Sequence, residues 1–152
     1  QAEDGIRDVE RSRGLGDVYK RQVIIGGQAK DFLGEYMSGG VIVVLGLSPS
    51  TTVKRSKLKV EGKSFLNTNI VGDFIGTGMH GGCIFIRGEI DERCLGKEVK
   101  KTKPSGADYS LLKEHLHDFC RYFQLNPEHI LNKPFIKLYP YTHRPYGRLY
   151  AY

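Results

Sequence analysis

The sequence predicts a mainly β fold, a parallel β-helix of stacked coils, followed by an α-helical segment and an extended aromatic tail. The first observation is a repeat: segments 31–46 and 73–88, 42 positions apart (73 − 31), carry the same residue at eight equivalent positions. The second is their shared pattern, a glycine cluster followed by four or five apolar residues and a closing glycine. The third is the high glycine content, 19 of 152 residues, which is typical of turn-dense β structure. Repeats of this kind predict units that bury their apolar faces by stacking on one another.

The apolar run in each repeat is too short for a helix and suits a strand. Ile42 and Val44 fall on one face of the first strand and match Ile84 and Ile86 on the second. The opposite face is also largely apolar, so we expect another segment to cover it. That outer face carries Val41, Val43 and Leu45 in the first strand and Cys83, Phe85 and Arg87 in the second.

Residues 76–81 also match the G-x-G-x-x-G pattern of a dinucleotide-binding turn. That turn requires a helix after the glycines, where the pyrophosphate binds at the helix N-terminus. Here a short apolar strand follows, and the sister segment 34–39 lacks the second glycine. We therefore interpret the glycines as structural and predict that this chain binds no cofactor. The predicted structural motif consists of Gly34, Gly39, Gly40, Gly46, Gly76, Gly78, Gly81, Gly82 and Gly88.

Three regions are predicted along the chain. Residues 1–22 hold five basic and five acidic residues without apolar periodicity, and their ending resembles a translated adapter scar. We interpret them as a non-native or disordered leader; the alternative is a genuine polar arm. Residues 23–96 form the predicted β-helix, which begins in mid-pattern and is therefore expected to be truncated at its N-terminus. Residues 97–152 form a helical extension and a docking tail.

Composition narrows the possible environment and partners of the chain. The net charge is +6, with a basic cluster within 54–59, but no aromatic residues are interleaved with it and no reading helix carries it. A solvated loop is therefore preferred to a nucleic-acid site. No apolar run of 18 residues predicts a membrane span, and residues 1–22 contain no secretory h-region. Three cysteines without C-x-x-C spacing favour reduced thiols in a cytoplasmic protein over a disulfide framework or metal site.

The C-terminal third changes in pattern. Asp108 is the expected N-cap of a helix that runs to about Phe123 with one apolar stripe, and 126–127 caps a short second helix. The tail, 135–152, holds five tyrosines and two prolines and is expected to cover the outer strand face or to bind a partner. The candidate partner-docking residues are Arg144, Tyr146 and Arg148.

Catalytic groups are not predicted in this chain. There is no G-x-S-x-G elbow, no Cys–His pair in a nucleophile setting and no cluster of carboxylates among the glycines. His80 is the one titratable group at the second glycine cluster, and its counterpart is Ser38, so a polar corner residue is preferred to a catalytic base. His115 and His117 are two positions apart on the predicted helix, which places them on different faces and argues against a metal site.

Residues 26–46 and 71–88, with their two glycine clusters, resemble the GXGXG domain of the glutamate synthase large subunit, most closely its stand-alone form. The ending, 135–150, is similar to the tail of those stand-alone chains. The resemblance covers roughly residues 23–152. It implies a right-handed parallel β-helix that has no catalytic groups of its own.

The resemblance also implies partners that hold the chemistry. These are a glutaminase that releases ammonia and an FMN and iron–sulfur synthase domain that makes glutamate from 2-oxoglutarate. The chain would then be a structural component of an oxidoreductase of glutamate biosynthesis and ammonia assimilation. The alternative is the related β-helix subunit of a formylmethanofuran dehydrogenase-like complex.

Overall fold

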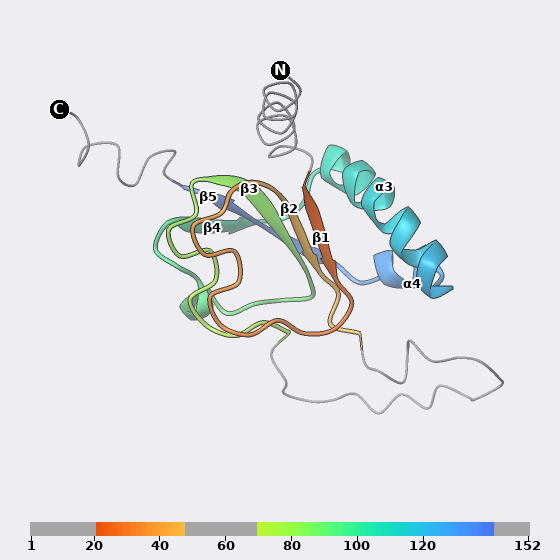
Figure 1. Cartoon of the computed structure of the whole chain (residues 1–152), viewed down its shortest axis with the longest axis horizontal. Helices are drawn as coiled ribbons and strands as arrows, with labels where there is room; N and C mark the ends of the chain where they lie inside the picture. The colour runs from red at the N-terminus through yellow and green to blue at the C-terminus, as the bar shows by residue number, and fades with distance from the viewer. Residues whose placement is uncertain (1–20, 48–69, 142–152) are drawn as a thin grey trace, which may run out of the picture.

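The computed structural model describes residues 21–47 and 70–141, which form one sheet with helices on one side and loops on the other (Figure 1). The sheet has the strand order β1-β2-β3-β5-β4. Its strands are β1 (Gln22–Ile25), β2 (Ser38–Val44), β3 (Gly81–Arg87), β4 (Val99–Thr102) and β5 (Phe135–Pro140). The helical elements are η1 (Glu92–Cys94), α3 (Gly106–Phe123) and α4 (Pro127–Leu131).

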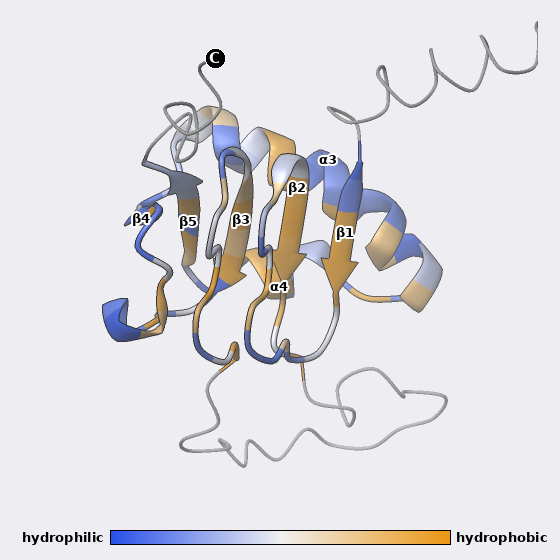
Figure 2. Ribbon diagram, turned by 60° about the vertical axis from the view of Figure 1, so that its left-hand side comes forward, coloured by the Kyte–Doolittle hydropathy of each residue, from blue (hydrophilic) through white to orange (hydrophobic). Residues whose placement is uncertain are grey.

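The two repeats place β2 and β3 side by side in parallel, as the 42-residue spacing predicts. The register pairs Ile42 with Ile84 and Val44 with Ile86, which are equivalent positions of the two repeats. Strand β1 pairs in parallel with the other edge of β2. In Figure 2 these three strands lie side by side and are mostly apolar.

The predicted parallel β-helix, right-handed or otherwise, is wrong. The structure is an open, mixed sheet, because β5 returns antiparallel along the free edge of β3 and β4 pairs antiparallel with β5. A solenoid would need another parallel strand on β3, but Ile84 and Ile86 face Leu138 and Ile136 of β5 across that edge. Within the described residues the coils therefore do not continue past the second repeat or close into a solenoid.

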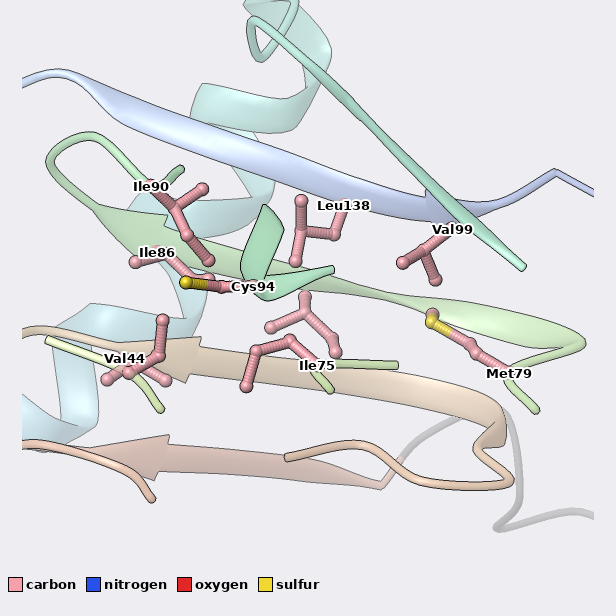
Figure 3. Packing of buried hydrophobic residues seen from close by; sticks show 10 residues of the cluster. Val44, Ile75, Met79, Ile86, Ile90, Cys94, Val99 and Leu138 are labelled. Carbon is pink, nitrogen blue, oxygen red and sulfur yellow. The ribbon is translucent and has the colours of Figure 1, made fainter. Parts of the chain in front are cut away.

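Both faces of the sheet are covered. On the inner face, side chains from β2, β3 and β5 pack against Ile75 and Met79 of the loop before β3 and against Cys94 of η1 (Figure 3). On the outer face, Val43 and Phe85 pack against Leu112 and Leu116 of α3. Helices α3 and α4 thus cover the outer face, which the sequence analysis expected another segment to cover. Residues 135–140 of the predicted tail instead form a strand in the sheet.

Helix α3 ends at Phe123, as predicted, but begins earlier than expected. Ser105 is its N-cap, and Asp108 is the third residue of the helix. The two form a capping box, in which each side chain accepts a hydrogen bond from the backbone N–H of the other residue. Asn126 caps α4 and Pro127 is its first residue, as the sequence predicts. Among the helices in the described ranges, none is long and apolar enough to cross a membrane.

Candidate functional site

The glycine clusters lie in two loops that precede β2 and β3. We call residues 26–37 and 70–80 the first and second corner loops. They stack directly on one another, with backbone hydrogen bonds that join equivalent or neighbouring positions of the two repeats. These bonds run from Ala29 N to Ile70 O (3.0 Å), Phe32 N to Asp73 O (2.8 Å), Tyr36 N to Thr77 O (2.8 Å) and Gly76 N to Leu33 O (2.8 Å).

The aspartate that begins each repeat links one layer of the fold to the next. Asp31 Oδ1 accepts a hydrogen bond from the backbone N–H of Asp73 at 2.9 Å. A Cβ at Gly72 would collide with the same carboxylate oxygen, so the glycine is required for this close approach. Asp73 in turn hydrogen-bonds Cys94, which raises the pKa of that thiol. The repeated aspartates therefore act as structural ties between layers.

Glycine is required at the strand entry because two backbones meet there. Gly82 has φ +80°, and a Cβ on it would lie 2.6 Å from Gly40 O. Gly81 lies so close to Ser38 O that a Cβ would overlap it. The predicted motif glycines with positive φ are Gly34, Gly40, Gly46, Gly76, Gly78, Gly82 and Gly88, while Gly39 and Gly81 lie within β2 and β3.

The G-x-G-x-x-G stretch does not have the geometry of a dinucleotide-binding turn. Strand β3 begins at Gly81, so the glycines are followed directly by a strand and not by the helix whose N-terminus would bind a pyrophosphate. The backbone donors of the turn are already used: Gly78 N donates to Glu98 Oε2 at 3.1 Å, and the N–H groups of His80 and Gly81 donate to Met37 O. Glu98 therefore accepts one of the backbone donors of this turn, which is consistent with a structural interpretation of the motif.

His80 is exposed at the end of the second corner loop. Its Nδ1 lies 3.2 Å from Gly78 O, within the same turn. Across the stack, its backbone N–H is bonded to Met37 O at 2.9 Å, one residue before its counterpart Ser38. This arrangement fits the predicted polar corner residue.

The three thiols are free and are unsuited to nucleophilic chemistry. Burial raises the pKa of Cys83 and of Cys120, and the hydrogen bond to Asp73 raises that of Cys94, so the thiolate is disfavoured at all three. Within residues 21–47 and 70–141, no group of three or more His, Cys, Asp or Glu side chains could hold a metal ion. His117 instead lies beside Asp118, 3.3 Å from its Oδ1.

The predicted docking residues Arg144, Tyr146 and Arg148 lie outside the described residues. The structure reveals two other features that the sequence analysis missed. Arg87 of β3 donates hydrogen bonds to main-chain carbonyls at the end of α4, including Ile130 O at 2.8 Å. Phe32 and Phe74, which are equivalent in the two repeats, stack on the surface of the corner loops. The presence of phenylalanine at this position in both repeats was the sequence signal that could have indicated this contact.

A protein-family model and a curated protein both match this chain. The family model described as "GXGXG motif" matches residues 13–141. The chain belongs to the GXGXG motif family. This confirms the resemblance to the GXGXG domain of glutamate synthase on which the sequence analysis relied. An uncharacterized protein of Methanocaldococcus jannaschii is 41% identical over 141 residues, which cover 88% of this chain and 48% of that protein. The chain therefore spans about half the length of this curated relative.

Proposed function

We propose that this chain is a non-catalytic, structural GXGXG subunit or domain of glutamate synthase, acting in glutamate biosynthesis and ammonia assimilation. The observation that carries the proposal is the family match over residues 13–141, which includes both glycine repeats. The stacked corner loops support a structural role, because their polar groups are engaged with one another.

The partners in this proposal are a glutaminase and an FMN- and iron–sulfur-containing synthase polypeptide or domain, in the cytoplasm. The cofactors belong to the synthase partner. In this chain, the raised pKa values of the cysteine thiols and the hydrogen-bonded donors of the glycine turn favour a structural role over a catalytic one. The GXGXG layer would hold its partners in a fixed relation, and the partners would carry out ammonia release and reduction.

Reconstitution tests this proposal. The full chain is combined with the FMN-binding synthase polypeptide and the glutaminase, and glutamate formation from 2-oxoglutarate and glutamine is measured. We expect turnover to depend on added GXGXG chain, while the FMN content of the synthase polypeptide stays the same with and without it. Equal glutamate formation in the absence of the chain would contradict the proposal, as would stoichiometric FMN on the GXGXG chain itself. Stimulation of a molybdopterin-containing partner instead would favour the formylmethanofuran dehydrogenase-like alternative.

A further inference from the structure

Positive charge is concentrated in residues 97–103, which comprise β4 and one or two residues on either side of it. This segment holds four lysines and one glutamate, and all four lysines are exposed. The rest of the described chain holds eight basic and ten acidic residues. A basic segment on a body that is otherwise slightly acidic attracts an anionic partner to that one place.

The carboxylates of Glu98 and Glu92, in and near this segment, are engaged with other groups. Glu98 Oε2 accepts a hydrogen bond from Gly78 N at 3.1 Å. Glu92 Oε1 lies 3.3 Å from Lys101 Nζ and forms an ion pair with it. The positive charge that the segment offers to a partner is therefore mainly that of Lys97, Lys100 and Lys103.

Two exposed tyrosines lie beside Lys100. Val99 is buried in the inner-face core, so the alternation of the strand directs Lys100 to the opposite face. Its partner on β5 is Tyr139, which is 37% exposed, and its Nζ lies 3.6 Å from the ring centroid of Tyr141, which is 59% exposed. This cation–π contact holds the ammonium in place, and the phenol O–H groups can donate hydrogen bonds to an anion. We call the following residues the basic surface: Lys97, Lys100, Lys103, Tyr139 and Tyr141.

The chemistry of the basic surface favours carboxylates over a nucleic acid. Proteins that bind single-stranded nucleic acids present open aromatic faces on which the bases stack. Here the Lys100 ammonium covers one face of the Tyr141 ring. Ammonium and phenol groups are hydrogen-bond donors, which match the acceptor oxygens of aspartate and glutamate. An extended acidic peptide also repeats its side chains at the same spacing, about 3.3 Å per residue, as the lysines of β4.

We propose that the basic surface binds an extended, acidic segment of a partner polypeptide. Carboxylates of that segment pair with Lys97, Lys100 and Lys103, and the exposed tyrosines provide the apolar and hydrogen-bonding part of the contact. The inference concerns the chemistry of the partner and not its identity, so it does not depend on the proposed function.

The test measures the affinity of the full chain for a fluorescein-labelled poly-L-glutamate by fluorescence anisotropy at physiological salt. In the first variant, Lys97→Gln, Lys100→Gln and Lys103→Gln are combined. We expect this variant to bind about tenfold more weakly than the wild type, because three exposed ion pairs of modest strength are lost. Its melting temperature, measured by circular dichroism, is the check on folding.

The matched control combines Lys30→Gln, Lys113→Gln and Lys133→Gln. These three lysines are also exposed, lie outside residues 97–103 and carry the same total charge. The control variant therefore has the same net charge as the first variant. It should bind poly-L-glutamate within about twofold of the wild type, because exposed charges farther than a Debye length from the contact are largely screened.

A second pair of variants covers the case in which loss of the Lys100 contact with Tyr141 lowers the melting temperature. Lys97→Gln with Lys103→Gln keeps that contact, and Lys113→Gln with Lys133→Gln is its control. The first of these double variants should bind poly-L-glutamate more weakly than the second.

Three outcomes would overturn the inference. One is that the wild type does not bind poly-L-glutamate. Another is an equal loss of affinity in the basic-surface variants and their controls, which would show that only the net charge of the chain matters. The third is tighter binding of a labelled single-stranded oligothymidylate than of poly-L-glutamate, with the loss confined to the basic-surface variants, which would identify a nucleic acid as the occupant.

Discussion

Gly82 illustrates how single residues decide the packing of the two repeats. Its φ of +80° lies in the region that disfavours side chains, and its Cα faces Gly40 O across the strand entry. Both effects act in the folded state, and neither depends on a ligand. The glycine pattern is therefore explained by backbone contact between layers.

Gly82→Ala is expected to destabilise the fold. Strain and overlap together should lower the free energy of unfolding by about 1–3 kcal/mol. Urea unfolding of the full chain measures this change. Gly106→Ala is the control, because no heavy atom lies within 4 Å of the added Cβ and the position begins α3. Equal stability of the Gly82 and Gly106 variants would show that the strand entry can relax.

Asp108 is a residue whose ionisation should contribute to acid stability. Its Oδ1 lies 2.6 Å from Lys137 Nζ, and both side chains are mostly buried. Burial alone would raise the pKa of Asp108, but hydrogen bonds from Lys137 and from Ser105 outweigh it and hold the pKa below its ordinary value of 3.8. The stabilisation from this lowered pKa is present above pH 3.8 and is lost as the pH falls through the folded-state value.

Asp108→Asn should therefore be less stable than the wild type at neutral pH, and the difference should shrink as the pH falls below about 3.8. Urea unfolding at a series of pH values provides the measurement. Asp118→Asn, whose carboxylate side chain is 75% exposed, is the control and should show little difference at any pH. A constant difference for Asp108→Asn down to pH 2 would mean that its ionisation is not coupled to folding.

At the scale of elements, the helices are held to the sheet by apolar packing and by Arg87. Leu112 and Leu116 are fully buried against the outer face. Arg87 donates to the carbonyls of Ile130 (2.8 Å), His129 (3.2 Å) and Leu45 (3.4 Å), and burial lowers the pKa of its guanidinium. One side chain of β3 thus joins the end of α4 to Leu45, the residue that follows β2.

Arg87→Lys should weaken this connection, because an ammonium cannot reproduce the three divergent N–H donors of the guanidinium. Loss of the hydrogen bonds to the carbonyls of the buried residues Ile130 and Leu45 should lower the free energy of unfolding by about 1–3 kcal/mol. Thermal unfolding of the full chain gives the comparison, with Arg121→Lys on the exposed face of α3 as the control. If Arg87→Lys and Arg121→Lys have the same melting temperature, apolar packing alone holds α4 in place.

At the scale of the whole molecule, the first part of the predicted docking tail belongs to the sheet. Residues 135–140 form β5, which joins β3 to β4, so their removal would disrupt the fold itself. The predicted docking residues Arg144, Tyr146 and Arg148 follow that strand. A truncation that tests their role must therefore keep β5 intact.

Deletion of 142–152 is expected to weaken binding to the synthase polypeptide by at least tenfold, and the melting temperature of the truncated chain is measured as the check on folding. The physical reason is that tyrosine and arginine concentrate binding energy at interfaces. Calorimetric titration measures the binding, and the FMN content of the partner should stay constant. A control chain with Arg144, Tyr146 and Arg148 replaced by alanine at full length tests whether these three residues account for the loss. If the truncated chain binds the synthase polypeptide as tightly as the full chain does, residues 142–152 do not contribute to this binding.

Local sequence patterns determined much of the structure. The repeat fixed the parallel register of β2 and β3, because equivalent residues such as Ile42 and Ile84 stack when identical corners precede them. Helix α3 and the cap at Asn126 followed from apolar periodicity and capping chemistry, which act within a few residues.

Only the tertiary structure decided how the sheet ends and which face the helices cover. The alternation in Phe135–Pro140 is compatible with a strand, but it does not specify a partner or a direction. Strand β5 pairs antiparallel with β3, so the fold is an open, mixed sheet and not the predicted β-helix. The left-handed conformation of Phe32 and Tyr36 was likewise not evident, since aromatic residues rarely adopt it. In each case the outcome depends on contacts between segments far apart in the chain, which short-range patterns do not encode.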